Sequence, residues 1–322
     1  MSSRTFIAIL LSLLTTQGVA TIAMAETPAV TTSPTSAVIP ATATALAPTD
    51  AAKGQVVRFR QQAGSVGDRV VQSLNVDLGL TTKITQSGQT AHESSNRMRR
   101  EQQRTIEVLE VVDGRTTRAR ASFQTSRRQT PESATPEELV TQPIEGKSYL
   151  MVRDGEKLII TDGAGATPPE EEIKLVTESL ENVGKPNPLA ALLVDRHVTV
   201  GQRILVPRDI VQPLLGFDGP MGSVHRFELT LLRVEPAPEA NGSPLAIFQT
   251  TIQITPNDES PLTITLNGEM HVETETCRLT TVEMKGPVQL SSIERTAGGI
   301  FQFSAGGELT LAIRSNYGAT IR

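Results

Sequence analysis

A period of two runs through long stretches of this chain, and it constrains the fold more than any other feature. Between residues 70 and 81 the apolar residues recur at even positions, and the residues between them are mostly polar. The apolar positions are Val70, Leu74, Val76, Leu78 and Leu80. Because successive side chains of a strand point to opposite faces, this segment is predicted to be a strand with one apolar face.

Three C-terminal segments repeat the pattern more cleanly. Their apolar faces carry Ile264, Leu266, Met270 and Val272, then Val282, Met284, Val288 and Leu290, then Phe301, Phe303, Leu309, Leu311 and Ile313. Further strands are predicted near residues 226–234 and 245–255. Consecutive strands with one apolar and one polar face indicate an antiparallel sheet that is wetted on one side.

Two dipeptides mark hairpin turns. Asp113-Gly114 predicts a long hairpin over residues 97–130, because this dipeptide favours the tight turns whose twist suits paired strands. Asp154-Gly155 predicts a second, shorter hairpin.

The period changes to that of a helix after Thr167, which is predicted to cap a helix that ends at Gly184. Asn187-Pro188 predicts the start of a second short helix, and residues 209–215 one further turn. The fold class is therefore mainly β with a helical insert at about 168–216. We expect about eleven long antiparallel strands in a curved sheet or open barrel, covered by two or three short helices, because long one-faced strands must curl around something.

The first 51 residues are predicted to lie outside this domain, which would span residues 52–322. Residues 1–25 have a weakly basic start, an apolar run and the small-x-small sequence Ala23-Met24-Ala25, which is the order of a secretory signal peptide. Residues 26–51 are rich in Pro, Thr and Ala and predict a disordered linker. No cysteine lies near the cleavage point, so a lipid anchor is not expected. The protein should be exported, to the periplasm or beyond the cell.

Composition and motifs predict no chemistry. The net charge of −5 gives no general attraction to nucleic acid, and no stretch after the signal is long and apolar enough for a transmembrane helix. The four histidines show no metal-ligand spacing, and no nucleophile elbow or phosphate loop is present. Cys277, the single cysteine, is expected to be a small strand residue. We therefore expect no catalytic residue, metal or cofactor, and no enzyme activity.

The charges are distributed unevenly. Residues 97–128 contain nine arginines and four acids, whereas residues 130–185 contain five basic residues and twelve acids. The arginines could contact an anionic partner, or they could pair across strands and on the surface with the acidic segment that follows, and the second interpretation is favoured.

The inferred architecture resembles the half-barrel of periplasmic lipoprotein carriers (LolA/LolB-like). Residues 187–216 and 262–290, which include Asn187-Pro-Leu-Ala-Ala-Leu-Leu, Leu266-Asn-Gly-Glu269 and Lys285-Gly-Pro287, are also similar to uncharacterised exported proteins of Gram-negative bacteria. The second resemblance implies fold and compartment but no chemistry.

Two functions fit these observations. In the first, an exported non-catalytic envelope protein shelters a lipid or a lipoprotein acyl chain in its curved sheet, against Leu266, Met270, Met284, Leu290, Phe301 and Phe303. In the second, a structural or partner-binding module contacts an anionic envelope component through the segment 97–128, with Arg118 and Arg120 as the contacts.

Overall fold

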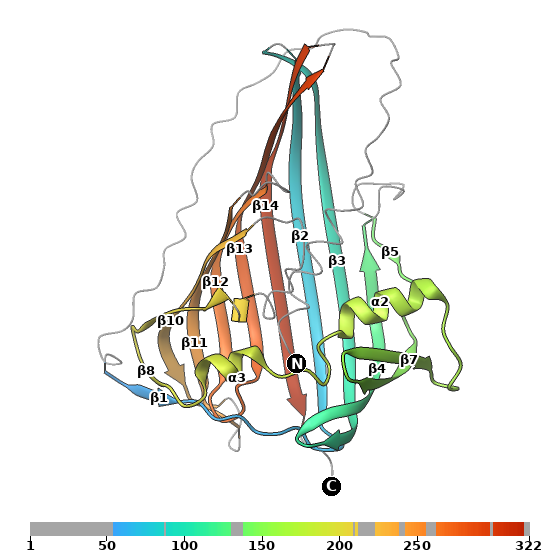
Figure 1. Ribbon diagram of the computed structural model, residues 1–322, viewed down its shortest axis with the longest axis vertical. Coiled ribbons are helices and arrows are strands. Elements are labelled where there is room, and N and C mark those ends of the chain that lie inside the picture. Colours follow the sequence, from blue (N-terminus) through green and yellow to red (C-terminus); the bar gives the residue numbers. More distant parts are fainter. Residues whose placement is uncertain are drawn as a thin grey trace.

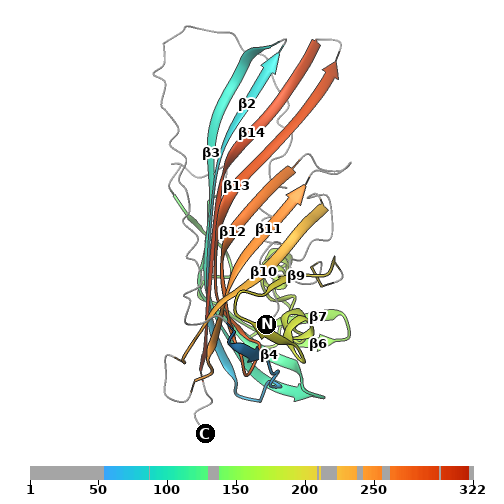
Figure 2. The same ribbon diagram turned by 90° about the vertical axis from the view of Figure 1, so that its left-hand side faces the viewer.

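The protein is built on one large antiparallel sheet that is not closed into a barrel. The computed structural model describes residues 54–86, 88–129, 138–208, 210–211, 223–237, 242–255, 262–296 and 299–318. The predicted signal peptide 1–25 and linker 26–51 lie outside these residues. The predicted fold class, mainly β with few helices and a curved sheet, is confirmed (Figures 1 and 2).

Twelve strands form this sheet, in the spatial order β7-β6-β4-β3-β2-β14-β13-β12-β11-β10-β9, with β5 beside β4. Their bounds are β2 Arg69–Gln86, β3 Gln89–Val112, β4 Arg115–Arg128, β5 Val140–Thr141, β6 Ser148–Asp154, β7 Lys157–Asp162, β9 Arg203–Leu205, β10 Ser223–Glu235, β11 Leu245–Thr255, β12 Leu262–Glu273, β13 Leu279–Thr296 and β14 Gly299–Gly318. A separate ribbon pairs β1 (Val56–Arg58) with β8 (His197–Thr199). Because β2 pairs with β14, the first and last strands of this sheet in chain order lie side by side in its middle.

Both predicted hairpins are confirmed. Asp113 and Gly114 have φ values of 50° and 73°, so both occupy the left-handed region that a tight hairpin turn between β3 and β4 requires. A second two-residue turn joins β6 to β7, since Asp154 pairs with Lys157, and there only Gly155 has a positive φ, of 55°. The strand β3 begins at Gln89, eight residues before the predicted hairpin. The prediction missed this extension because residues 89–96 are almost entirely polar and show no alternation.

Two helices lie on the concave side of the sheet, in its lower half (Figures 1 and 2). The helix α2 spans Glu170–Leu180 and α3 spans Pro188–Leu193. The predicted start of α3 is confirmed, since the Asn187 side chain accepts a hydrogen bond from Leu189 N. The predicted Thr167 cap is wrong: Pro169 precedes α2 and no side chain caps it, although three glutamates in its first turn favour the helix dipole. Of the predicted turn at 209–215, Ile210 and Val211 are helical and the other residues lie outside the description.

The buried apolar side chains form two clusters. The larger lies between α3, the β1–β8 ribbon and the concave face of β2 and β9–β14. The smaller lies between α2 and the concave face of β2, β3, β4, β6 and β7. Each helix therefore covers its own part of the sheet.

Glycines on neighbouring strands allow the strands to approach closely where the sheet curves. A Cβ atom on Gly268 of β12 or on Gly286 of β13 would lie 1.9 Å from a backbone oxygen of the adjacent strand. A Cβ atom on Gly307 of β14 would lie 1.7 Å from Gly79 O of β2. Only a residue without a side chain fits at such positions.

Replacing Gly307 by Ala should lower the free energy of unfolding by about 1–3 kcal/mol, because the new methyl group must displace the backbone of β2. The matched control is Gly306→Ala, where a Cβ atom would have no neighbour within 4 Å. That change should leave stability unchanged or slightly raised. Urea denaturation followed by circular dichroism measures both, and equal effects would contradict the close approach.

Candidate ligand sites on the concave side

Three of the six predicted ligand-contact residues are closed off by the protein itself. Leu266, Met270 and Met284 are 2%, 4% and 2% exposed and belong to the larger cluster. The apolar side chains of α3 and the β1–β8 ribbon fill the space in front of them. This part of the sheet is a protein core and not an open surface.

The other three lie where the sheet extends beyond its helical cover. The long strands β2, β3, β13 and β14 continue above α2 and α3 as a four-stranded projection (Figures 1 and 2). Leu290, Phe301 and Phe303 lie half-buried on it. The cross-strand register places Phe303 opposite Ile84 and Leu290 opposite Ala305, on the face that continues the buried row Leu309 and Leu311.

We call this surface the apolar stripe, and it comprises Leu80, Ile84, Leu290, Phe301 and Phe303, all half-buried. The opposite, convex face of the same strands carries polar residues such as Lys83, Gln302 and Ser304, with Ile300 52% exposed among them. Sequence alternation identified the face correctly, but not which part of it a helix would cover.

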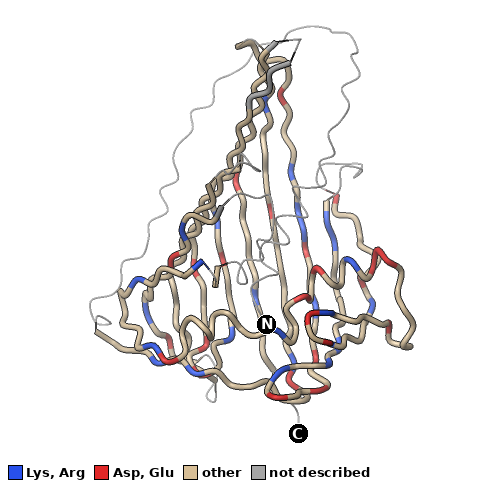
Figure 3. The backbone as a smooth tube through the Cα atoms, viewed as in Figure 1, with Lys and Arg blue, Asp and Glu red and all other residues tan. Residues whose placement is uncertain are grey.

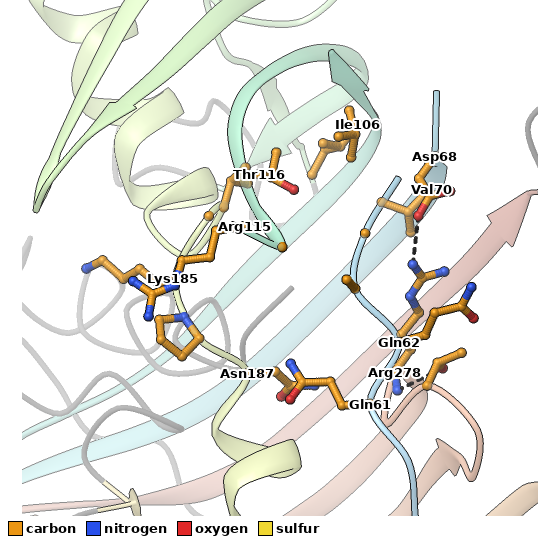
Figure 4. A pocket seen from close by; sticks show the side chains of 18 of the residues that line it. Gln61, Gln62, Asp68, Val70, Ile106, Arg115, Thr116, Lys185, Asn187 and Arg278 are labelled. Atoms are coloured by element: carbon orange, nitrogen blue, oxygen red, sulfur yellow. Dashed lines mark hydrogen bonds and ion pairs between the residues drawn. The ribbon is translucent and has the colours of Figure 1, made fainter. Parts of the chain in front are cut away.

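A second feature is a cavity of about 390 Å³ at the foot of the sheet, which we call the foot cavity. Val70, Ile106 and Val108 of β2 and β3 line it from the sheet, and the turn 113–116 and the loop 182–187 between α2 and α3 form further walls. Figure 4 shows Arg115, Thr116 and Lys185 on one side of it and Asp68, Arg278 and Gln61 on the other. Neither its position nor its loop residues could be identified from alternation, because loops carry no period.

Several contacts hold the loop wall of the foot cavity in place. Arg153 of β6 donates through Nε to Val183 O at 3.0 Å, and its Nη2 donates to Glu181 O. Gly184 has a φ of 82°, and a Cβ atom there would lie 2.3 Å from Thr116 O, so the loop abuts the hairpin turn. Asn187 Nδ2 donates to Cys277 O at 2.8 Å. The wall is therefore tied to the sheet at both ends.

The arginines of residues 97–128, which belong to the hairpin of β3 and β4, are divided between the two faces of the sheet. Arg118 and Arg120 are exposed on the convex face, with Arg120 paired to Glu107 at 3.2 Å. Further ion pairs join Arg97 to Asp77, Arg99 to Glu101 and Arg127 to Glu145. Most of these partners lie on β2 and β3 and not in the acidic segment 130–185, and Figure 3 shows the two signs interspersed along the strands.

Two arginines of the hairpin are buried on the concave face, which sequence reasoning missed. Arg104 is 2% exposed and donates through Nη1 to Gln102 Oε1 at 3.0 Å and through Nη2 to Gln72 Oε1. Burial, together with the charge of Arg100, lowers its pKa to about 9. Burial likewise lowers the pKa of Arg100 to about 10. Arg100 and Arg104 share the alternation of residues 98, 100, 102, 104 and 106, whose side chains face the concave side of β3. Sequence reasoning missed this because charged side chains are usually found on the surface.

A cluster around Glu172 fastens α2 to β6. Tyr149 donates its hydroxyl to Glu172 Oε2, and Lys147 Nζ donates to Oε1 at 2.7 Å. These two bonds hold the pKa of Glu172 below its usual range. Because all three groups are used in packing one helix on one strand, the cluster is structural.

Within the described part of the chain, no group of three or more His, Cys, Asp and Glu residues is arranged to hold a metal ion. Nor does that part contain a helix long and apolar enough to cross a membrane. Cys277 lies in the turn between β12 and β13, with a φ of 53°, so its predicted place in a strand is wrong.

Comparisons with known proteins show no family for this chain. No family model matches the sequence, and no curated protein matches it. A structure reporting lipid–protein interactions in lipovitellin is 11% identical, over 80% of this chain and 26% of that chain, with a TM-score of 0.34. The outer membrane protein OprG from Pseudomonas aeruginosa is 5% identical, over 80% of this chain and 99% of that chain, with a TM-score of 0.13. At these TM-scores neither likeness supports an argument about function.

The Cys277 thiol should be inert in the folded protein. It is 0% exposed, and burial raises its pKa to about 12, so very little thiolate forms near neutral pH. A colorimetric disulfide reagent at pH 8 should detect no thiol in the native protein and one thiol per chain in concentrated denaturant. Rapid labelling of the native protein would contradict the buried placement.

Proposed function

We propose that this chain is an exported, non-catalytic envelope protein that shelters an apolar ligand, such as a lipid or an acyl chain, against the apolar stripe. The observation that carries the proposal is the row of half-buried apolar side chains on the concave face of the projection, which no described helix covers. Contiguous exposed apolar surface of this kind marks interaction sites in water-exposed proteins.

The shape of the stripe suits a long, flexible, apolar ligand. Its members lie on three adjacent strands, β13, β14 and β2, and include two phenylalanines separated by one residue on β14. Polar residues of β3 border it, because Asn96 lies opposite Leu80 of β2 and Ser94 lies opposite Thr82 of β2. An acyl chain laid along the stripe would remove the exposed part of the two phenylalanine rings from water. Because the rings are already half-buried, the gain for each would be about half of the 1.5–3 kcal/mol that full burial supplies.

The stripe adjoins the closed core, and this supports a sheltering role. Val288 of β13 and Leu309 of β14 are both 1–2% exposed and belong to the larger cluster. Leu290, two residues beyond Val288, packs against that cluster and is only half-buried. A ligand on the stripe would therefore extend the protein's own core upward.

Replacing Phe301 and Phe303 by Ser should weaken binding of a fluorescent acyl probe at least tenfold, because both rings lose their contact with the ligand. Ile300→Ser is the matched control, since Ile300 is 52% exposed on the convex face of the same strand. Titration of the purified chain measures both, and native mass spectrometry tests for copurified lipid. A lipid-free mass together with equal probe binding by all variants would refute the proposal.

A second candidate function uses the convex face. Arg120 lines a shallow polar hollow of about 320 Å³ with Arg69, Thr105 and Gln124, and Arg118 forms no ion pair in the described part of the chain. An anionic envelope component would fit this surface.

Reversing both charges, with Arg118→Glu and Arg120→Glu, should then reduce recovery of such a component from envelope extract severalfold. Lys157→Glu, an exposed change on β7, is the control. Unchanged recovery by the double variant would dismiss this second function.

A further inference from the structure

We propose that the foot cavity binds a small anionic amphiphile, with a carboxylate at its cationic mouth and a short apolar tail on its floor. This inference goes beyond sheltering by the apolar stripe and does not depend on it. The two features share the concave side but lie at opposite ends of β14. Phe303 and Tyr317 are fourteen positions apart on β14, and Tyr317 lines the foot cavity. At roughly 3.3 Å per residue the two sites are about 46 Å apart along the strand.

The size and floor of the foot cavity suit an apolar tail. Its volume of about 390 Å³ lies in the range of small-molecule sites, roughly 300–1,000 Å³. Val70 and Ile106 are 6% and 3% exposed and form the base, with Val108 and Val183 beside them. These side chains continue the smaller apolar cluster, so a tail placed there would meet core-like surroundings.

The mouth carries an excess of positive charge. Three basic residues, Arg115, Lys185 and Arg278, line the cavity from the concave side, against the two acids Asp68 and Asp113. Arg278 and Asp68 neutralise each other, because Arg278 Nη2 donates to Asp68 Oδ2 at 2.8 Å. Arg115 forms no ion pair in the described residues, and Figure 4 shows it beside Lys185 at the loop wall. Lys185 Nζ is already paired with Glu181 at 2.9 Å and Glu156 at 3.7 Å, so the Arg115 guanidinium is the cation of the mouth that is left to bind an anion.

The mouth is also built to hold its shape. Lys185 is 16% exposed in its side chain and is fixed by Glu181 at 2.9 Å. The Arg278 guanidinium lies 5.0 Å from the centre of the Tyr317 ring, which holds this wall against the sheet. With Gly184 and Arg153 fixing the loop, a ligand would meet cations that are already placed, so little ordering cost accompanies binding.

Three probes separate the two parts of the ligand. Decanoate has both the anion and the tail, decanol has only the tail, and acetate has only the anion. Isothermal titration of the full chain should show decanoate binding at least tenfold more tightly than either of the others. Decanol binding as tightly as decanoate would overturn the anionic mouth, and acetate binding as tightly would overturn the apolar floor.

Variants then locate the site. Arg115→Gln should weaken decanoate about tenfold and leave decanol unchanged, because only the charged contact is lost. Val108→Ser, at a half-buried position, should weaken both tailed probes. Lys157→Gln, at an exposed position of β7 that does not line the cavity, is the control and should change neither.

The result also distinguishes this site from the apolar stripe. Phe301→Ser with Phe303→Ser should leave decanoate binding intact. If that pair abolished decanoate binding while Arg115→Gln did not, the ligand would lie on the stripe and the foot cavity would be refuted as the site. Equal acyl-probe binding by the unchanged chain and by this double variant, with decanoate binding retained, would refute only the proposed function.

Discussion

An open sheet with one continuous apolar face must have that face covered, and the rest of this structure follows from how the cover is distributed. A closed barrel would bury its own inner face, but here β7 and β9 remain as edges. The helix α3 and the β1–β8 ribbon cover the larger cluster, with Phe59 of the chain after β1 packed 6.0 Å from Phe248, ring centre to ring centre. The helix α2 covers the smaller one. The strands β2, β3, β13 and β14 are longer than this cover, so an apolar surface remains.

How far the sequence predicts this arrangement depends on whether the information is local. Alternation in the C-terminal strands and the Asp-Gly turns are local, and they predicted the strands and hairpins correctly. The pairing of β2 with β14 joins residues more than two hundred positions apart, and no local pattern encodes it. The same limit applies to the site. Met284 and Phe303 occur in similar alternating patterns, yet Met284 is buried and Phe303 is half-buried. The difference is the cover that α3 and the β1–β8 ribbon provide over Met284, and these elements come from distant parts of the chain.

The buried arginines show where a simple apolar-inside rule fails. Two cations without a carboxylate at ion-pair distance in the described chain are costly to bury, so each requires neutral hydrogen-bond partners. Gln72 and Gln102 accept from Arg104, and Gln102 Nε2 donates to Ser126 and Ser179, which brings α2 into the same network. This polar layer lies on the sheet between the regions covered by α2 and α3. Docking α2 therefore requires a match of hydrogen bonds as well as apolar contact, which favours one position of the helix over others.

Curvature joins the two proposed sites to one physical cause. A flat sheet with this apolar face would present a broad surface that favours aggregation, whereas a curled one directs the face inward. Gly268, Gly286 and Gly307 allow the strands to approach where side chains would collide, and the last two lie on β13 and β14, which reach both the closed core and the projection. At the lower end the loop 182–187 meets the turn after β3, so the concavity becomes a walled cavity, open to solvent on one side, with charged residues in its lining. At the upper end nothing described lies opposite the strands, and the same inward face remains an open apolar stripe. One bend in one sheet thus accounts for both proposed sites, a small walled one for a charged, short-tailed ligand and an extended one for a purely apolar ligand.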